Sequence, residues 1–168
     1  MQEAITVRPA REDDLEDVAR ISTEAYAAAG QLDPGSTYGD VLADAAARRD
    51  SAVLLVAERA GRIVGTVTIC PEGSPFAEIG RHGEVEFRFL AVDPAAWRSG
   101  VADALIEACE DQARSAHAER LAICVRDTNT GAAEMYERRG FTRMPDRDWT
   151  PVPGVNLHAL RRDVLPSD

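Results

Sequence analysis

The sequence predicts a mixed α/β fold with the element order βααβββαβαββ, in which helices flank a central mixed, twisted sheet. Short stretches in which apolar and polar residues alternate, bounded by proline or glycine, are typical of strands. Between them lie stretches whose apolar residues recur at helical spacing. The chain has 168 residues, 45% of them hydrophobic, which is enough for one core and short for two. We therefore expect residues 1–168 to form a single domain.

The first third of the chain reads as one strand and two helices. Ile5–Arg8 alternates apolar and polar residues and stops at Pro9, as a first strand would. The acidic residues 12–14 suit the start of a helix, which we expect to end before Gly30. A second helix is expected over 38–49, because its apolar residues form one stripe.

Three strands follow. Residues 51–58 and 62–69 are rich in β-branched and aliphatic residues and flank Ala60-Gly61, which predicts a short hairpin turn. Residues 71–83 are rich in proline and glycine and predict a loop. Residues 84–92 then form the expected fourth strand.

The fourth strand changes the phase of its apolar pattern. Val85, Phe87 and Phe89 alternate on one face, whereas Leu90 and Val92 continue one residue out of step. A one-residue bulge would account for the slip and would splay the end of the strand. The alternative is a strand that is buried on both faces at this end.

The last third of the chain again shows stretches with the helical spacing of apolar residues and stretches with the alternation of strands. We expect helices over 101–112 and 132–139, and strands over 121–126, 141–144 and 155–163. The proline-rich loop 145–154 carries Trp149, which could line an acceptor site, plug the core or form a dimer contact.

Composition excludes several kinds of chemistry. All 19 basic residues are arginines, so the chain has no lysine for a Schiff base, a P-loop or a kinase site. The net charge of -10 argues against nucleic-acid and anionic-membrane partners and favours a basic or amine-bearing one. The three cysteines form no CxxC pair and the histidines are scattered, which predicts no metal site. With no signal sequence and no long apolar run, we expect a cytoplasmic protein.

The segment 93–102 joins the fourth strand to the next helix and contains Gly100 and the small Ala102. The unpaired N–H groups at a helix start can hold a phosphate or pyrophosphate, although a plain connection would have the same pattern. The segment has neither a GxGxxG nor a P-loop pattern, so a dinucleotide or P-loop fold is not indicated.

Two motifs resemble one known family. Leu90-Ala91-Val92-Asp93-Pro94 is followed by Trp97-Arg98-Ser99-Gly100-Val101-Ala102, and further on stands Asn129-x-x-Ala132-x-x-x-Tyr136-x-x-x-Gly140-Phe141. Both are similar to signatures of the GNAT superfamily of acyl-CoA-dependent N-acyltransferases, with Trp97 where arginine or glutamine is usual. The resemblance implies a GNAT-like fold with a bulged fourth strand, and acetyl-CoA as cosubstrate without a metal.

The resemblance also implies roles for individual residues. The backbone of the fourth strand would pair with pantetheine, the loop would hold the pyrophosphate with Arg98 able to replace the usual side chain, and Asn129 would touch pantetheine or cap its helix. The implied cofactor-binding residues are Leu90, Ala91, Val92, Trp97, Arg98, Ser99, Gly100, Val101, Ala102, Asn129 and Tyr136.

Two residues are candidates for proton transfer. Glu86 stands where some members of the family carry a catalytic glutamate, although Glu84 or a water could serve, or Glu86 could pair with Arg88 or face solvent. Tyr136 resembles the general acid of the family. We therefore expect an N-acetyltransferase that acts on a primary amine of a small molecule or peptide, as a monomer or a homodimer. The alternative is an acyl-CoA-binding module without turnover.

Overall fold

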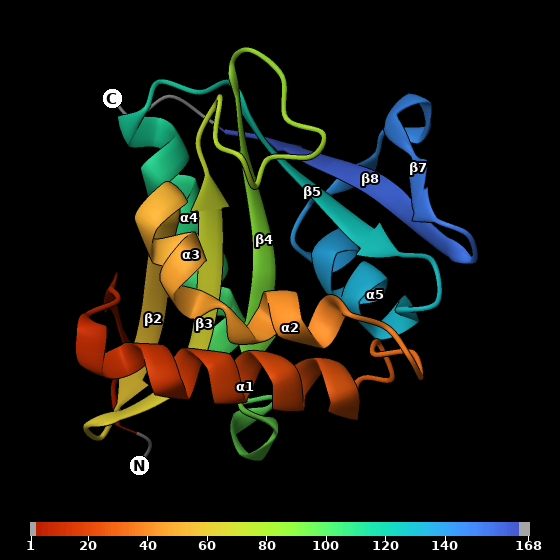
Figure 1. The fold of residues 1–168 in the computed structure, drawn as a ribbon. Coiled ribbons are helices and arrows are strands. Elements are labelled where there is room, and N and C mark those ends of the chain that lie inside the picture. The colour runs from red at the N-terminus through yellow and green to blue at the C-terminus, as the bar shows by residue number, and fades with distance from the viewer. Residues whose placement is uncertain (1–2, 165–168) are drawn as a thin grey trace.

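The computed structural model describes residues 3–164, which form one mixed sheet with the strand order β1-β2-β3-β4-β5-β8-β6, while β7 pairs with β8 (Figure 1). β4 and β5 are parallel and the other pairs are antiparallel. The strands are β1 (Thr6–Pro9), β2 (Val53–Arg59), β3 (Arg62–Cys70), β4 (Glu84–Val92), β5 (Arg120–Arg126), β6 (Thr142–Arg143), β7 (Trp149–Val152) and β8 (Val155–Asp163).

Helices cover both faces of the sheet. The α-helices of the described residues are α1 (Leu15–Ala28), α2 (Tyr38–Ala43), α3 (Ala45–Ser51), α4 (Val101–Ser115) and α5 (Thr130–Arg138). α1, α2 and α3 lie in front of the sheet in Figure 1, and α4 lies behind it. Short 3-10 turns precede α1 (Glu12–Asp14), follow β4 (Pro94–Ala96) and precede β7 (Pro145–Arg147).

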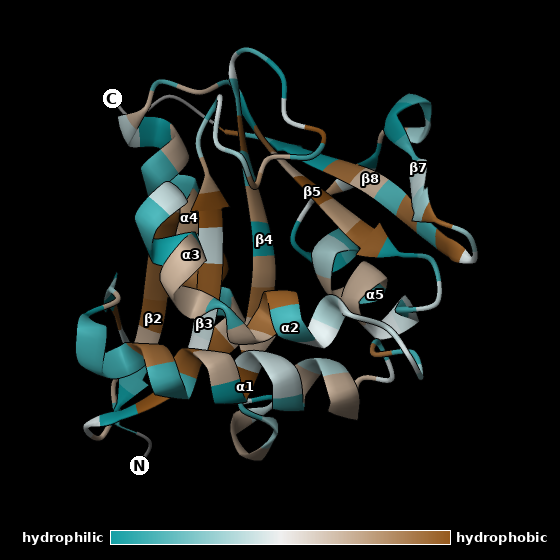
Figure 2. Cartoon of the chain, viewed as in Figure 1, coloured by the Kyte–Doolittle hydropathy of each residue, from teal (hydrophilic) through white to brown (hydrophobic). Residues whose placement is uncertain are grey.

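The two largest apolar clusters of the described residues lie on opposite faces of the sheet. The larger contains Leu105 of α4 and Tyr136 of α5 together with Phe87 of β4, and the smaller joins Val18 and Ile21 of α1 to the other face. Figure 2 shows long hydrophobic stretches in the central strands, whereas the helices mix hydrophilic and hydrophobic residues. The sheet has a core on each face because successive side chains of a strand point to opposite faces. The mixed α/β class is confirmed.

The single helix predicted over 38–49 is wrong, because the chain breaks into α2 and α3 at Asp44. Asp44 leaves the helical region with ψ 67° and its side chain accepts the N–H of Ala47, which starts a new helix. The guanidinium of Arg48 is fully buried and donates to the carbonyls of Val41 and Leu42. It therefore pairs the Leu42 carbonyl at the end of α2 and adds a second bond to the Val41 carbonyl, which also accepts the N–H of Asp44.

The loop predicted over 145–154 also needs correction, because it contains β7. Trp149 pairs with Leu157 of β8, and Val152 pairs with Val155. β7 lies at an edge, where Pro151 removes no hydrogen bond that a further strand would need. The other predicted elements are confirmed, with ends that shift by up to three residues.

The bulge in β4 is confirmed. Thr66 of β3 pairs with Ala91 and Thr68 pairs with Arg88, so Phe89 and Leu90 together stand opposite one residue of β3. Phe89 has a φ of 57°. It lies on the α1 side of the sheet rather than beside Phe87, since its ring stacks on Tyr38.

No helix among residues 3–164 is long and apolar enough to cross a membrane.

Candidate functional site

β4 and β5 diverge and leave an opening in the sheet. They pair only where Glu84–Glu86 lie opposite Arg120–Ala122, and β4 then continues without this neighbour to Val92 (Figure 1). Ala91 pairs with Thr66, and the N–H of Asp93 donates to Val64 at 2.9 Å, so both residues point toward β3. The backbone groups of Val92 point the other way, into the opening. An extended ligand with amide groups could pair with this free edge.

The loop at the end of this opening presents backbone N–H groups. Arg98 and Gly100 have φ values of 61° and 89°, and Gly100 is the N-cap of α4 without a side-chain cap. Left-handed residues beside a helix start make a concave set of N–H groups, and the helix dipole adds positive potential. This arrangement suits a phosphate or pyrophosphate. A Cβ at Gly100 would have room, since the nearest atom, on Ile5, is 3.9 Å away, so the backbone conformation is what requires glycine.

Arg59 at the end of β2 holds this loop in place. Its Nη1 donates to Oγ of Ser99 at 3.0 Å and its Nη2 donates to the Ser99 carbonyl at 2.8 Å. Ser99 Oγ donates in turn to the Ala96 carbonyl at 2.6 Å. The sequence analysis missed Arg59, because nothing in the local pattern shows that it meets a loop 40 residues away.

α4 begins directly against the sheet. A Cβ at Gly65 of β3 would lie 2.7 Å from Cγ1 of Val101 and 3.0 Å from Cδ1 of Leu105. No side chain fits there, so glycine at position 65 lets the first turn of α4 approach β3 closely. The N–H groups at the helix start are thereby fixed beside the end of β4.

Most of the cofactor residues expected from the sequence offer only backbone groups to a ligand. Val101 is 1% exposed, and Leu90 and Val92 pack against the same core. One exception is Trp97, which is 45% exposed and whose Nε1 donates to the Val92 carbonyl at 2.8 Å. Arg98 is also exposed, and Ala102 lies in the first turn of α4.

Asn129 and Tyr136 lie at α5. Oδ1 of Asn129 accepts the N–H of Ala132 at 3.3 Å, so Asn129 caps the helix as one of the two expected roles requires. Tyr136 is 6% exposed, and its ring packs on Phe87 and Phe141 with centroid distances of 6.1 and 5.3 Å. Burial raises the pKa of Tyr136 above its ordinary value.

Glu86 is fully buried, and its two carboxylate oxygens differ. Oε1 accepts the N–H groups of Glu78, Ile79 and Gly80 at 2.8, 2.9 and 2.9 Å. Oε2 is buried without a hydrogen-bond partner. The expectation that Glu86 faces solvent is wrong, because Glu86 is buried. The expectation that it pairs with Arg88 is also wrong, because Nε of Arg88 lies 3.0 Å from Oε1 of Glu78 instead.

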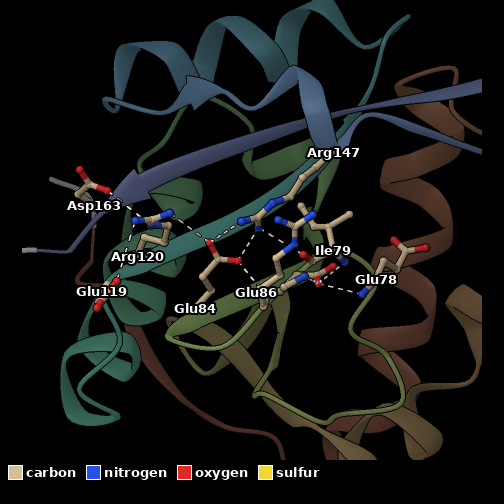
Figure 3. A network of polar contacts seen from close by, with 10 residues as sticks. Glu78, Ile79, Glu84, Glu86, Glu119, Arg120, Arg147 and Asp163 are labelled. Atoms are coloured by element: carbon tan, nitrogen blue, oxygen red, sulfur yellow. Dashed lines mark hydrogen bonds and ion pairs between the residues drawn. The ribbon is translucent and has the colours of Figure 1, made fainter.

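Glu84 forms ion pairs and hydrogen bonds with three arginines. Arg147 donates to its two oxygens at 2.5 and 3.1 Å, Arg120 lies at 3.5 Å, and the N–H of Arg81 donates at 2.9 Å. Figure 3 shows Arg147 and Arg120 reaching Glu84 while Glu86 turns toward residues 78–80. Burial alone would raise the pKa of Glu84, but the bonds from Arg147 and Arg81 and the charge of Arg120 outweigh it and lower the pKa.

An aromatic and charged cluster lies beside Glu86 on the α1 face. The guanidinium groups of Arg88 and Arg48 lie 4.3 and 4.8 Å from the centre of the Phe89 ring, and Tyr38 stacks on that ring. Burial raises the pKa of Glu78, although the charge of Arg88 acts in the opposite direction. The contact with Tyr38 shows that the β4 bulge directs Phe89 toward α2, while Leu90 and Val92 border the opening.

The three cysteines, of which Cys70 and Cys109 are buried and Cys124 is partly buried, provide no nucleophile at neutral pH. Burial raises the pKa of Cys70 and of Cys124 to about 12 and also raises that of Cys109. A thiol must lose its proton to attack a carbonyl. Among residues 3–164, no group of His, Cys, Asp and Glu side chains is arranged to hold a metal ion.

The bulged strand that diverges from its parallel neighbour beside an uncapped helix start is the arrangement that the resemblance to the acyl-CoA-dependent N-acyltransferases implied. The family model described as "Acetyltransferase (GNAT) family" matches residues 15–141, so the chain belongs to this family of acetyl-CoA-dependent acetyltransferases. No curated protein sequence matches the chain significantly.

Solved structures of GNAT proteins share the fold over nearly their whole length. The ribosomal-protein-S18-alanine N-acetyltransferase of Escherichia coli has a TM-score of 0.70 and 18% identity, with 98% of this chain and 97% of that one covered. YncA of Salmonella typhimurium, a putative acetyltransferase with its cofactor acetyl-CoA, has a TM-score of 0.67, 23% identity and coverages of 96% and 95%. The PaiA N-acetyltransferase of Thermoplasma acidophilum, in complex with coenzyme A, has a TM-score of 0.71, 14% identity and coverages of 95% and 99%.

Proposed function

We propose that this acetyltransferase moves an acetyl group from acetyl-CoA to a primary amine of a small molecule or peptide, by direct attack within a ternary complex. The observation that supports this most is the free edge of β4 at Val92, which faces the opening beside the loop 97–100. Acetyl-CoA supplies an acyl group that its thioester activates. The net charge of -10 favours an acceptor that carries a positive charge.

The cofactor would be held mainly by main-chain groups. Leu90 and Val92 offer their free edge to the pantetheine arm, and Ala91 keeps that edge in place by pairing with Thr66. The loop from Trp97 through Ala102 offers N–H groups to the pyrophosphate, with the Arg98 side chain exposed nearby. Asn129, besides capping α5, lies at the end of β5 that borders the opening.

Glu86 is the proposed base. An ammonium group has no lone pair with which to attack, so a base, here a carboxylate, would first accept its proton. Oε2 of Glu86 has no other partner, whereas both oxygens of Glu84 are held by arginine. The geometry therefore favours Glu86 over Glu84. Because Glu86 is fully buried, its proton would arrive through a water.

Tyr136 is the proposed acid. Its phenol would donate a proton to the leaving sulfur, and packing against Phe87 and Phe141 fixes the ring. The raised pKa keeps this proton in place at neutral and mildly alkaline pH. The protonated cysteines argue against an acyl-cysteine intermediate and so favour direct transfer.

The test is an acceptor screen with acetyl-CoA, read by release of free thiol and by mass spectrometry of the product. The panel should contain amino acids, polyamines, aminoglycosides and peptides. We expect amine-dependent thiol release and an acetylated product with at least one class. Binding of CoA without turnover across the panel would instead favour an acyl-CoA-binding module.

A further inference from the structure

We infer that Trp97 is a cofactor-responsive residue whose indole occupies the pantetheine position on β4 until coenzyme A displaces it. The inference rests on the proposed acyl-CoA site and concerns how this chain regulates access to it. It starts from one contact, in which Nε1 of Trp97 donates to the Val92 carbonyl at 2.8 Å.

The Val92 carbonyl is the group that an extended amide ligand would use. Its neighbours Ala91 and Asp93 point toward β3, so the carbonyl of Val92 points into the opening between β4 and β5. A carbonyl at a free strand edge attracts any N–H donor that comes alongside it. In this structure the donor is the indole of Trp97.

The path of the chain brings the indole to this place. Asp93 starts a tight turn in which its side chain accepts the N–H of Ala95 and its carbonyl accepts the N–H of Ala96. This turn reverses the chain, so that Trp97 lies beside Val92, five residues earlier.

The contact is of a kind that can be broken at low cost. Trp97 is 45% exposed, so its indole N–H can exchange the Val92 carbonyl for water. The loop itself need not unfold, because Arg59 and Ser99 anchor its other end through their own bonds. A rotation of the Trp97 side chain would be enough to free the carbonyl.

The amide groups of the pantetheine arm and the indole N–H therefore compete for one acceptor. Removing the indole N–H should strengthen the binding of coenzyme A, because the free protein then has no internal bond to lose. If the Trp97 bond has the net strength of an ordinary hydrogen bond, its removal should raise the affinity for coenzyme A by about 2- to 10-fold.

The test compares the wild type with Trp97→Phe, which keeps an aromatic side chain but has no N–H donor. Calorimetric titration with coenzyme A should give a dissociation constant about 2- to 10-fold lower for Trp97→Phe. Adenosine 3′,5′-bisphosphate, which lacks the pantetheine arm, should bind both proteins equally. Trp149→Phe is the matched control, since Trp149 lies on β7 and should leave the affinity for coenzyme A unchanged.

Fluorescence provides a second readout that needs no turnover. Trp97 and Trp149 are the two tryptophans of the chain, so Trp149→Phe reports on Trp97 alone. Coenzyme A should change the emission of that variant and leave that of Trp97→Phe nearly constant. Equal or weaker binding of coenzyme A by Trp97→Phe, or an unchanged Trp97 signal, would overturn the inference alone. If neither protein binds coenzyme A, the proposed function fails with it.

Discussion

Glu84 on β4 and Arg147 in the turn before β7 form a two-point ion pair across 63 residues of sequence, with N···O distances of 2.5 and 3.1 Å. Their side chains are only 4% and 10% exposed. The pair fixes the segment before β7 against the start of β4. Next to it, Glu86 fixes residues 78–80 through three N–H bonds. Two neighbouring carboxylates of one strand thus position two loops at the same end of the sheet.

The first prediction concerns the stability that this ion pair provides. Arg147→Met should lower the free energy of unfolding by about 3 kcal/mol, at the lower end for a broken buried pair, because Arg120 still lies near Glu84. Arg143→Met breaks the more exposed pair with Asp148 and should cost at most about 1 kcal/mol. Urea unfolding of the three proteins at neutral pH measures both values.

Acid should remove the same stabilisation. The folded-state pKa of Glu84 lies below the ordinary value of 4.5, so its contribution is present above that pH and is lost as the pH falls further. The difference in stability between the wild type and Arg147→Met should therefore shrink below pH 4.5. A difference that stays constant to the acid limit would show that Arg147 acts through packing alone.

The sequence predicts the course of β4 well, because the bulge leaves a trace in the pattern. Leu90 and Val92 stand out of phase with Val85 and Phe87, and the structure has the extra residue between Arg88 and Ala91. The helix start at Gly100 is predictable for a similar reason, since glycine in a turn before an apolar helix is a local signal.

Contacts between distant segments leave no such trace. The sequence identifies Glu86 as a candidate base but does not show that residues 78–80 fold over its Oε1. It also gives no reason to link Arg59 to Ser99. The break at Asp44 could have been found, because aspartate before a run of alanines is a typical N-cap.

The second prediction concerns the proposed pyrophosphate loop. Gly100→Val should abolish the rise in melting temperature that coenzyme A produces in the wild type, because valine disfavours the φ of 89° that orients the N–H groups. Gly154→Val is the matched control, with a φ of 84° and open space around it in the β7–β8 turn. Both substitutions should lower stability by about 1–3 kcal/mol, and only the control should keep the coenzyme A shift. Retention of the full shift by Gly100→Val would rule out the loop.

The third prediction concerns Glu86. Glu86→Gln keeps an oxygen for the N–H groups of residues 78–80 and loses the basic oxygen, so turnover should fall by about 10²–10⁴-fold while the melting temperature changes little. The loss should shrink at high pH, where the free amine is abundant. Glu86→Ala removes the loop bonds as well and should also unfold more easily. A small loss of turnover in Glu86→Gln that does not vary with pH would assign Glu86 to loop positioning only.

The last prediction concerns Tyr136, which separates an enzyme from a binding module. Tyr136→Phe keeps the ring between Phe87 and Phe141 and removes only the hydroxyl, so stability should change little. The proton is needed only as the C–S bond breaks. The loss should therefore appear in kcat, at about 10–10³-fold, with the affinity for acetyl-CoA nearly unchanged.

The pH profile distinguishes this role from that of Glu86. Because burial raises the pKa of Tyr136 above its ordinary value of 10, the phenol remains protonated from pH 6 to 9. The ratio of wild-type to Tyr136→Phe turnover should thus stay constant over that range, unlike the ratio for Glu86→Gln. Tyr38→Phe, which removes a hydroxyl from the ring that stacks on Phe89, is the control and should retain kcat. Wild-type turnover in Tyr136→Phe would make Tyr136 a core residue with water as the acid, and lost acetyl-CoA binding would make its hydroxyl a cofactor ligand.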